Sequence, residues 1–300
     1  MLRIEPKAEY ADVMERALYN CTLAGMALDG KHFFYVNPLE VNPKKSLKDP
    51  GKSHVKPVRP SWLGCACCPP NLARMITSMD DYVYTILNDT VLVNLFVDST
   101  ATLDVEGGSV EIIQSTDYPW DENVRLTIKN NSDSNIRIGV RIPGWTNDIS
   151  IKADGQDILV DPDKGYQYMS ISSGQEISAK LILKMEILRN YSNPLVSENV
   201  GKVAISRGPF IYCLEGVDNG EDLHCISLPE SALLEYKYEP GLLNGTGVIT
   251  GIGKKIITTK ESEDLYLSGK PKLEDTKLKF IPYYAWANRG ENEMEVWVRE

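Results

Sequence analysis

The spacing of apolar residues changes near residue 90, and this change constrains the fold more than any other feature of the sequence. Before residue 90, apolar residues recur every three or four positions, as they do on one face of a helix. After it, they alternate with polar residues, as they do in half-buried strands. The 300-residue chain is therefore predicted to have a short helical region followed by a long all-β region.

Two helices are predicted before residue 85. The apolar face of the first comprises Tyr10, Val13, Met14, Ala17, Leu18 and Cys21, and that of the second comprises Leu72, Met75, Ile76, Met79 and Val83. Pro69 and Pro70 stand at the start of the second helix, where proline is tolerated. Residues 1–85 offer too few apolar partners to cover both faces. We therefore expect them to be the C-terminal part of a larger helical body that begins upstream of Met1.

The β region divides at a break near residues 190–194. Alternating runs include Ile136–Ile142 and the positions Ile177 to Met185, and turn signals such as Asp154-Gly155 separate them. This pattern predicts two antiparallel β-sandwich domains, residues 86–190 and 191–300, after the helical part at 1–85. The strands alone should suffice for each β domain to fold without the helical part.

Charge and hydropathy exclude several kinds of partner. The chain has 32 Lys and Arg against 42 Asp and Glu, a net charge of −10, which disfavours nucleic acid. No apolar run approaches the roughly 20 residues of a membrane span, and the N-terminus lacks the apolar core of a signal peptide. These features predict a cytoplasmic protein. Uncovered helical faces favour self-association, of which a homodimer is one form.

Three of the six cysteines gather in the segment Gly64-Cys65-Ala66-Cys67-Cys68-Pro69-Pro70-Asn71. Six cysteines are too sparse for a disulfide scaffold, and such a cluster is typical of metal binding or thiol chemistry in a reducing compartment. A helix starting near Asn71 would direct its positive end at the sulfurs and stabilise a thiolate.

The spacing of the cysteines leaves three interpretations open. The first is a zinc–thiolate site with a reactive sulfur. The second is a closed structural zinc site, with His54 as the fourth ligand. The third is a set of buried thiols that bind no metal. The two CxxC pairs of a zinc ribbon are absent.

Several strings of the sequence resemble glycoside hydrolase family 127, the β-L-arabinofuranosidase family. They are Ala11–Asn20, Asp29–Glu40, Gly64–Asn71, Gly201–Pro209 and Tyr212–Glu215, and GCACCPPN is the most specific of them. The resemblance extends over essentially the whole chain. It implies an (α/α)6 barrel followed by two β-sandwich domains, so the helical region would be the remnant of that barrel.

The same resemblance implies retaining hydrolysis of terminal β-L-arabinofuranosides, with a zinc-bound cysteine as nucleophile. By its motif, the nucleophile is Cys67, the zinc ligands include Cys67 and Cys68, and Tyr35 lies in the sugar pocket. Cys65 matches a position that is not a ligand. The family's acid/base glutamate and its other zinc ligands lie upstream of the matched region. We therefore expect an incomplete site, with zinc as cofactor and an L-arabinofuranosyl oligosaccharide or glycoconjugate as substrate.

A second class of function stays open, in which the chain is not an enzyme. Its β-sandwich modules would bind carbohydrate or a partner protein, and its zinc–thiolate site would be structural. Trp120, Trp145 and Trp286 could stack on a sugar, although a place in the sandwich cores is the simpler expectation. Glu40 is expected to be a turn carboxylate rather than the acid/base.

Overall fold

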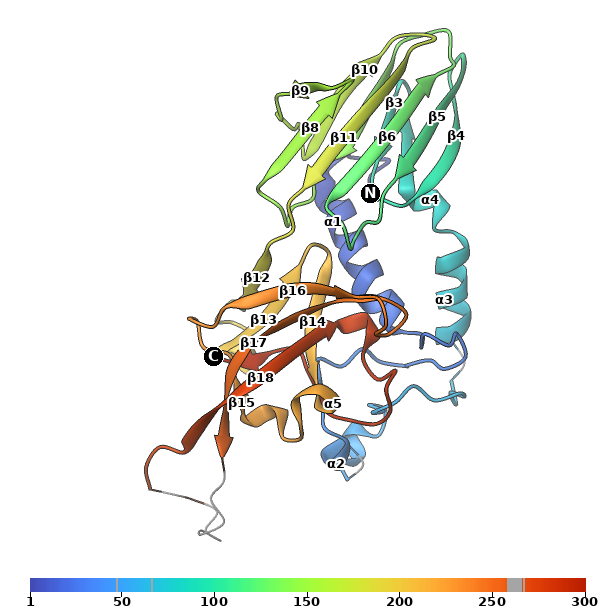
Figure 1. The fold of residues 1–300 in the computed structure, drawn as a ribbon. Helices are drawn as coiled ribbons and strands as arrows, with labels where there is room; N and C mark the ends of the chain where they lie inside the picture. Colours follow the sequence, from blue (N-terminus) through green and yellow to red (C-terminus); the bar gives the residue numbers. More distant parts are fainter. Residues whose placement is uncertain (47, 66, 258–265, 267) are drawn as a thin grey trace. The chain divides into compact units, whose positions relative to one another are not determined.

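The computed structural model describes residues 1–300 except 47, 66, 258–265 and 267. The chain forms two compact units, and each combines an N-terminal segment with a stretch of the β region (Figure 1). Unit 1 consists of Met1–Leu18 and Asn71–Glu186, and unit 2 consists of Tyr19–Pro70 and Ile187–Glu300. The mostly β composition agrees with the expected fold class. The expected domain limits at residues 85 and 190 stay a prediction.

Both predicted helices are present near the N-terminus. The helices are α1 (Ala8–Arg16), which continues as a π-helical turn (Ala17–Thr22), α2 (Pro43–Ser46), α3 (Cys68–Thr77), α4 (Asp80–Val83) and α5 (Gly216–Asn219). Pro69 and Pro70 lie in the first turn of α3, as predicted. Helix α2 lies in a stretch without apolar periodicity. Within the described residues, no helix is both long and apolar enough to cross a membrane.

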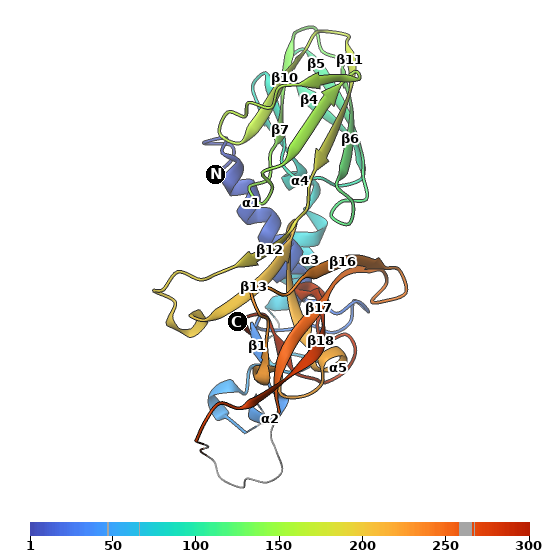
Figure 2. The same ribbon diagram turned by 60° about the vertical axis from the view of Figure 1, so that its left-hand side comes forward.

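Unit 1 contains two hydrogen-bonded sheets, which form its two layers (Figures 1 and 2). The four-stranded sheet has the order β10-β7-β3-β2, and the six-stranded sheet has the order β4-β5-β6-β11-β8-β9. The strands are β2 (Tyr84–Leu87), β3 (Thr90–Val93), β4 (Ser99–Val105), β5 (Gly108–Ser115), β6 (Asn123–Asn130), β7 (Ile136–Arg141), β8 (Ile149–Ala153), β9 (Gln156–Ile158), β10 (Tyr166–Ile171) and β11 (Glu176–Leu183).

The alternation in the sequence correctly gives the buried face of β11 but not that of β7, where Gly139 and Arg141 are buried as well. On β11, Ile177, Ala179, Leu181 and Leu183 are buried, and the residues between them are exposed or half-buried. Because successive side chains of a strand point to opposite faces, one face of the strand covers the core. The Asp154-Gly155 turn between β8 and β9 is also confirmed, since both residues have positive φ angles.

The buried face of α1 differs from the predicted apolar face. Val13 is 70% exposed, whereas Ala8, Ala11 and Glu15 are buried. A buried glutamate is unfavourable unless it is paired, and Glu15 is paired with Arg141 at the end of β7. The helix is therefore oriented by an ion pair between residues far apart in the sequence, which hydrophobic periodicity does not reveal.

Arg141 has no exposed side-chain surface, and its guanidinium lies 5.5 Å from the centroid of the Phe96 ring. Its guanidinium donates to both carboxylate oxygens of Glu15, to Asp12 Oδ1 at 2.6 Å and to the Asn94 carbonyl at 2.5 Å. Glu15 also accepts from Tyr118 Oη at 2.6 Å. The middle β region thus depends on α1 for a charged partner, which argues against folding of residues 90–300 alone.

We expect Glu15→Gln to destabilise unit 1 strongly. The variant keeps the shape of the side chain but leaves Arg141 with one neutral partner, and breaking a buried ion pair typically costs about 3–5 kcal/mol. Urea unfolding followed by circular dichroism measures the loss. Asp157→Asn is the matched control, because its pair with Lys152 is exposed and should contribute about 0–1 kcal/mol. Equal losses for both variants would contradict this account of Arg141.

Unit 2 is built on one ten-stranded sheet rather than on two separate sheets. Its strands are β1 (Glu40–Val41), β12 (Ile187–Asn190), β13 (Lys202–Arg207), β14 (Phe210–Glu215), β15 (Ile226–Ser227), β16 (Leu234–Glu239), β17 (Thr246–Ile257), β18 (Lys272–Pro282), β19 (Met294–Glu295) and β20 (Val298–Arg299). Pairing runs in a ring through β13, β14, β18, β17, β15, β20 and back to β13. The expected second sandwich is therefore hydrogen-bonded as a closed ring with strands attached to it.

Trp286 lies in the core of unit 2, as expected for a structural tryptophan. It is fully buried and stacks on Phe34 with ring centroids 4.6 Å apart. The Arg59 guanidinium lies over the Phe34 ring, 4.5 Å from its centroid. It donates hydrogen bonds to the backbone carbonyls of Ala24, Tyr284 and Trp286. Arg59 thereby connects the N-terminal segment of unit 2 to the turn that follows β18.

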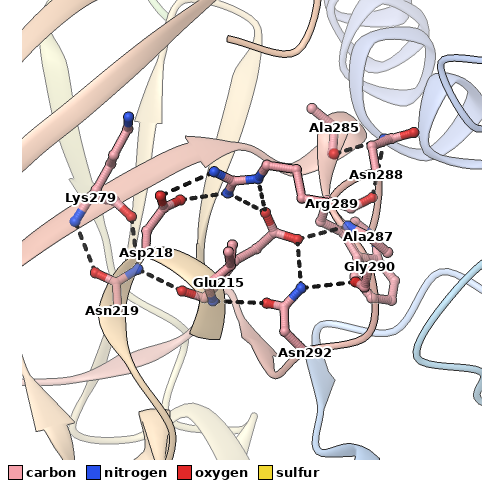
Figure 3. Close-up of polar contacts among 12 residues, drawn as sticks. Glu215, Asp218, Asn219, Lys279, Ala285, Ala287, Asn288, Arg289, Gly290 and Asn292 are labelled. Atoms are coloured by element: carbon pink, nitrogen blue, oxygen red, sulfur yellow. Dashed lines mark hydrogen bonds and ion pairs between the residues drawn. The ribbon is translucent and has the colours of Figure 1, made fainter.

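A second arginine, the partly buried Arg289, holds the loop that carries Trp286. Figure 3 shows Arg289 between Asp218 and Glu215, with Nη2 at 2.5 Å from a carboxylate oxygen of each. Glu215 is fully buried and also accepts from the backbone N–H of Ala287, whose φ of 59° is unusual for a residue with a side chain. These contacts stabilise an otherwise unfavourable turn.

Glu295 gives unit 2 a pH-dependent stability. It is 5% exposed and faces Glu40 across the β1–β19 pair. Burial, together with the Glu40 carboxylate, raises the pKa of Glu295 from 4.5 to about 7. The folded state therefore binds more protons than the unfolded state between these values, so stability falls as the pH rises through this window.

We expect Glu295→Gln to remove much of that loss. The thermal midpoint of the wild-type chain should fall between pH 5 and pH 8 by more than that of the variant. Glu235→Gln is the control, because Glu235 is exposed on β16. If the thermal midpoint falls by the same amount in the variant, the control and the wild type, Glu295 does not titrate in this range.

Candidate active site

The cysteine segment ends where helix α3 begins. The helix starts at Cys68 rather than near Asn71, so Cys68 lies in its first turn and Cys67 directly precedes it. The two prolines that follow have no backbone N–H to leave unsatisfied there. The partial positive charge of a helix N-terminus is thus placed beside the two sulfurs, as the sequence predicts.

The three sulfurs of this segment lie close together. Cys65 Sγ is 3.7 Å from Cys67 Sγ, and Cys67 Sγ is 3.6 Å from Cys68 Sγ. Cys65 and Cys67 are exposed and Cys68 is partly buried. All six cysteines lie in the described part of the chain, and none forms a disulfide. The interpretation as three buried thiols is therefore wrong.

The spacing of Cys67 and Cys68 fits two thiolate ligands of one zinc ion. A Zn–S bond is about 2.3 Å long, so two sulfurs at the corners of a tetrahedral site lie roughly 3.8 Å apart. The observed 3.6 Å is close to that separation. The soft, negatively charged donors that zinc prefers are thus already arranged as a pair.

The rest of a zinc site is not assembled by the residues that the structure describes. Among them, no three His, Cys, Asp or Glu side chains are grouped so that they could hold a metal ion. His54 is exposed and does not complete such a group. A closed structural zinc site with His54 as fourth ligand is therefore not formed by this part of the chain.

Tyr35 follows an isolated bridge between Met26 and Phe33, and Glu40 is the first residue of β1. Tyr35 is 51% exposed, and its place in a sugar pocket stays a prediction. Glu40 is exposed in β1, where it takes part in strand pairing opposite Glu295.

Two of the remaining cysteines are poor candidates for chemistry. Cys213 is fully buried in β14, and burial raises its pKa well above the usual value. Cys225 is partly buried, and burial raises its pKa as well. A thiol that stays protonated is a weak nucleophile. This agrees with the expectation that Cys213 behaves as a small apolar side chain.

The sequence analysis missed a polar pair at a cavity of about 530 Å³ in unit 2. His32 Nδ1 lies 2.6 Å from Asp29 Oδ2, and Arg59 and Asn288 line the same cavity. The feature of the sequence that indicates this pair is an aspartate three residues before a histidine. Asn288 accepts from the backbone N–H of Leu28, and Arg59 binds backbone carbonyls, so both hold the fold together.

Comparison with known proteins identifies the family. Residues 1–81 match the GH127 catalytic domain of β-L-arabinofuranosidases, residues 90–187 match the GH127 middle domain, and residues 187–299 match the GH127 C-terminal domain. The chain belongs to glycoside hydrolase family 127.

The similarity to relatives within family 127 extends along essentially the whole chain. A non-reducing end β-L-arabinofuranosidase of Bifidobacterium longum is 37% identical over 100% of this chain and 46% of its own length. The crystal structure of a GH127 β-L-arabinofuranosidase from Geobacillus stearothermophilus T6 has a TM-score of 0.95 at 47% identity, over 100% of this chain and 47% of that one. A solved GH127 β-arabinofuranosidase has a TM-score of 0.86 at 34% identity, over 98% of this chain and 46% of that one. This family 127 chain therefore spans about half the length of these relatives.

We expect iodoacetamide to label Cys67 before the cysteines of the β strands. Cys67 is exposed beside a helix N-terminus, whereas burial protects Cys213 and slows Cys225. Peptide mapping after brief labelling of the reduced, chelator-treated protein measures the order. Labelling after unfolding in urea is the control, since all six thiols should then react alike. Faster labelling of Cys213 or Cys225 in the folded protein would refute the assignment.

Proposed function

We propose that this chain is part of a retaining β-L-arabinofuranosidase in which Cys67 is the nucleophile. The observation that carries the proposal is the exposed turn on which the Cys67 and Cys68 sulfurs lie 3.6 Å apart at the start of α3. The names of the family 127 relatives supply the substrate class, a β-L-arabinofuranoside at a non-reducing end. We propose that an oligosaccharide or glycoconjugate carries this sugar.

In this mechanism, Cys67 Sγ attacks the anomeric carbon as the glycosidic bond breaks, and a covalent glycosyl-cysteine forms. Water then attacks the anomeric carbon on the face opposite to the sulfur, which leaves as the thiolate, so two successive inversions retain the configuration. The exposure of Cys67 leaves its sulfur open to an incoming sugar. Tyr35, half exposed on its own segment, is proposed to pack against that sugar.

Cys67 and Cys68 are proposed to hold zinc, because their separation suits two thiolate ligands. Bound zinc would keep both sulfurs deprotonated at neutral pH. A thiol nucleophile must also stay reduced, so a cytoplasmic location belongs to the same proposal. Homodimer formation stays a prediction.

We further propose that the acid/base glutamate and the remaining zinc ligands lie outside these 300 residues. The chain spans about half of its relatives, and the described residues assemble no metal group of three ligands. The exposed faces of the helices support the same proposal. Helix α3, which is described throughout, buries none of its side chains, and Val13 of α1 is 70% exposed. These faces would pack against the other helices of an (α/α)6 barrel.

The alternative is a non-catalytic carbohydrate- or partner-binding protein. A sugar-binding tryptophan should expose one face, but Trp286 is fully buried and Trp145 donates to Glu15 at 3.1 Å. The structural zinc site of this alternative is also not assembled by the residues that the structure describes. The hydrolase is therefore the better supported of the two.

We expect the 300-residue chain alone to show no hydrolysis of a chromogenic β-L-arabinofuranoside and to bind zinc weakly. A zinc site needs at least three protein ligands, and general acid–base help contributes about 10²–10⁴-fold to such reactions. Fusing the unmatched part of the Geobacillus enzyme ahead of residue 1 should restore both properties.

In that fusion, Cys67→Ser should abolish turnover, and Cys65→Ser under reducing conditions is the matched control that keeps it. Two results would sink the proposal. One is turnover by the isolated chain at the rate of the fusion, and the other is full activity of the Cys67→Ser fusion.

A further inference from the structure

Cys65 belongs to the cysteine segment but has no role in the proposed reaction. Its sulfur is exposed and lies 3.7 Å from that of Cys67. We propose that Cys65 is the resolving thiol of Cys67: a peroxide converts the two into a reversible disulfide, which protects Cys67 from irreversible oxidation. Only the effect on catalysis rests on the proposed function, since the disulfide chemistry needs nothing beyond the two thiols.

The geometry favours Cys65 over Cys68 as the partner of Cys67. Both sulfurs lie at nearly the same distance from Cys67 Sγ, 3.7 and 3.6 Å. Adjacent residues, however, have Cα atoms only about 3.8 Å apart across a trans peptide bond. Disulfides usually span about 4.4–6.8 Å between Cα atoms. Cys67 and Cys68 fall short of that range, whereas residues two positions apart can reach it.

Cys213 and Cys225 cannot serve as the resolving thiol. Cys213 is fully buried in β14, and burial raises its pKa well above the usual value. Cys225 lies in another part of the fold, next to β15, and is partly buried. An exposed thiol beside its partner has the advantage, because oxidation depends on access and on thiolate character.

The reaction balances with one peroxide and two thiols. The Cys67 thiolate attacks a peroxide oxygen, the O–O bond breaks, and a proton taken up by the leaving oxygen gives water and Cys67 sulfenic acid. Cys65 sulfur then attacks Cys67 sulfur, the S–O bond breaks, and the thiol proton leaves with the hydroxide as a second water. Two thiols lose two electrons, and hydrogen peroxide is reduced to two waters. A dithiol reverses the process by thiol–disulfide exchange.

The disulfide would switch the site off without destroying it. A sulfur held by Cys65 can neither attack a sugar nor ligate zinc, and it is kept from the sulfinic and sulfonic acids, which reductants do not reverse. Zinc bound to Cys67 should compete with oxidation, because it occupies the same sulfur lone pairs.

The test uses the full 300-residue chain, reduced and stripped of metal with a chelator, and then treated with hydrogen peroxide. After alkylation with iodoacetamide and trypsin digestion, the three clustered cysteines lie in one peptide, residues 53–74. We expect this peptide to have lost two hydrogen atoms and to carry one alkyl group, with fragment ions placing that group on Cys68. Dithiothreitol before alkylation should restore three alkylated thiols.

Two variants complete the test. In Cys65→Ser, Cys67 should proceed to sulfinic and sulfonic acid, so the fraction recovered by dithiothreitol should fall about fivefold or more. Cys21→Ser, which removes an exposed cysteine outside the segment, should behave as the wild type. A Cys67–Cys68 disulfide, a disulfide between chains, or equal recovery in Cys65→Ser would each overturn the inference.

These measurements need no hydrolysis, so the two proposals can fail separately. A fusion that hydrolyses arabinofuranosides but shows no intramolecular disulfide would overturn the resolving role of Cys65 alone. An inactive fusion whose Cys65–Cys67 disulfide forms and reverses would overturn the proposed hydrolase and leave the disulfide in place.

Discussion

A guanidinium buried in a protein must be surrounded by hydrogen-bond acceptors, and this requirement determines how the chain is put together. Desolvation of an ion costs several kcal/mol, so each buried arginine needs partners already in place when the fold closes. Arg141 finds them on α1, Arg59 finds backbone carbonyls in unit 2, and Arg289 finds Glu215 and Asp218. In each case the contacts join segments far apart in the sequence.

These arginines explain why the helical and β regions do not separate at residue 90. The Arg141–Glu15 pair makes α1 part of unit 1, and Arg59 with Phe34 makes the N-terminal segment part of the core of unit 2. The cysteine segment begins at Gly64, five residues after Arg59 in the sequence.

The cysteine segment itself is a local structure. Two prolines favour the first turn of α3, and the short spacing of the cysteines places the sulfurs of Cys65 and Cys68 at 3.7 and 3.6 Å from that of Cys67. In the proposed mechanism, this one short turn would supply the nucleophile, a pair of metal ligands and the resolving thiol. The proposed metal binding and the proposed disulfide would both use the Cys67 sulfur, so each would exclude the other.

The sequence by itself determined the features that depend only on residues close together in the chain. The alternation on β11, the turn at Asp154-Gly155, the start of α3 and the gathering of three sulfurs follow from side-chain period, backbone preference and spacing. Tertiary structure alone decided that Glu15 rather than Val13 is buried on α1, that the strands of unit 2 close in a ring, and that His54 joins no metal group in the described chain. The physical reason is that a buried charge, a strand partner or a metal ligand is chosen among residues distant in the sequence, and hydrophobic periodicity contains no information about that choice.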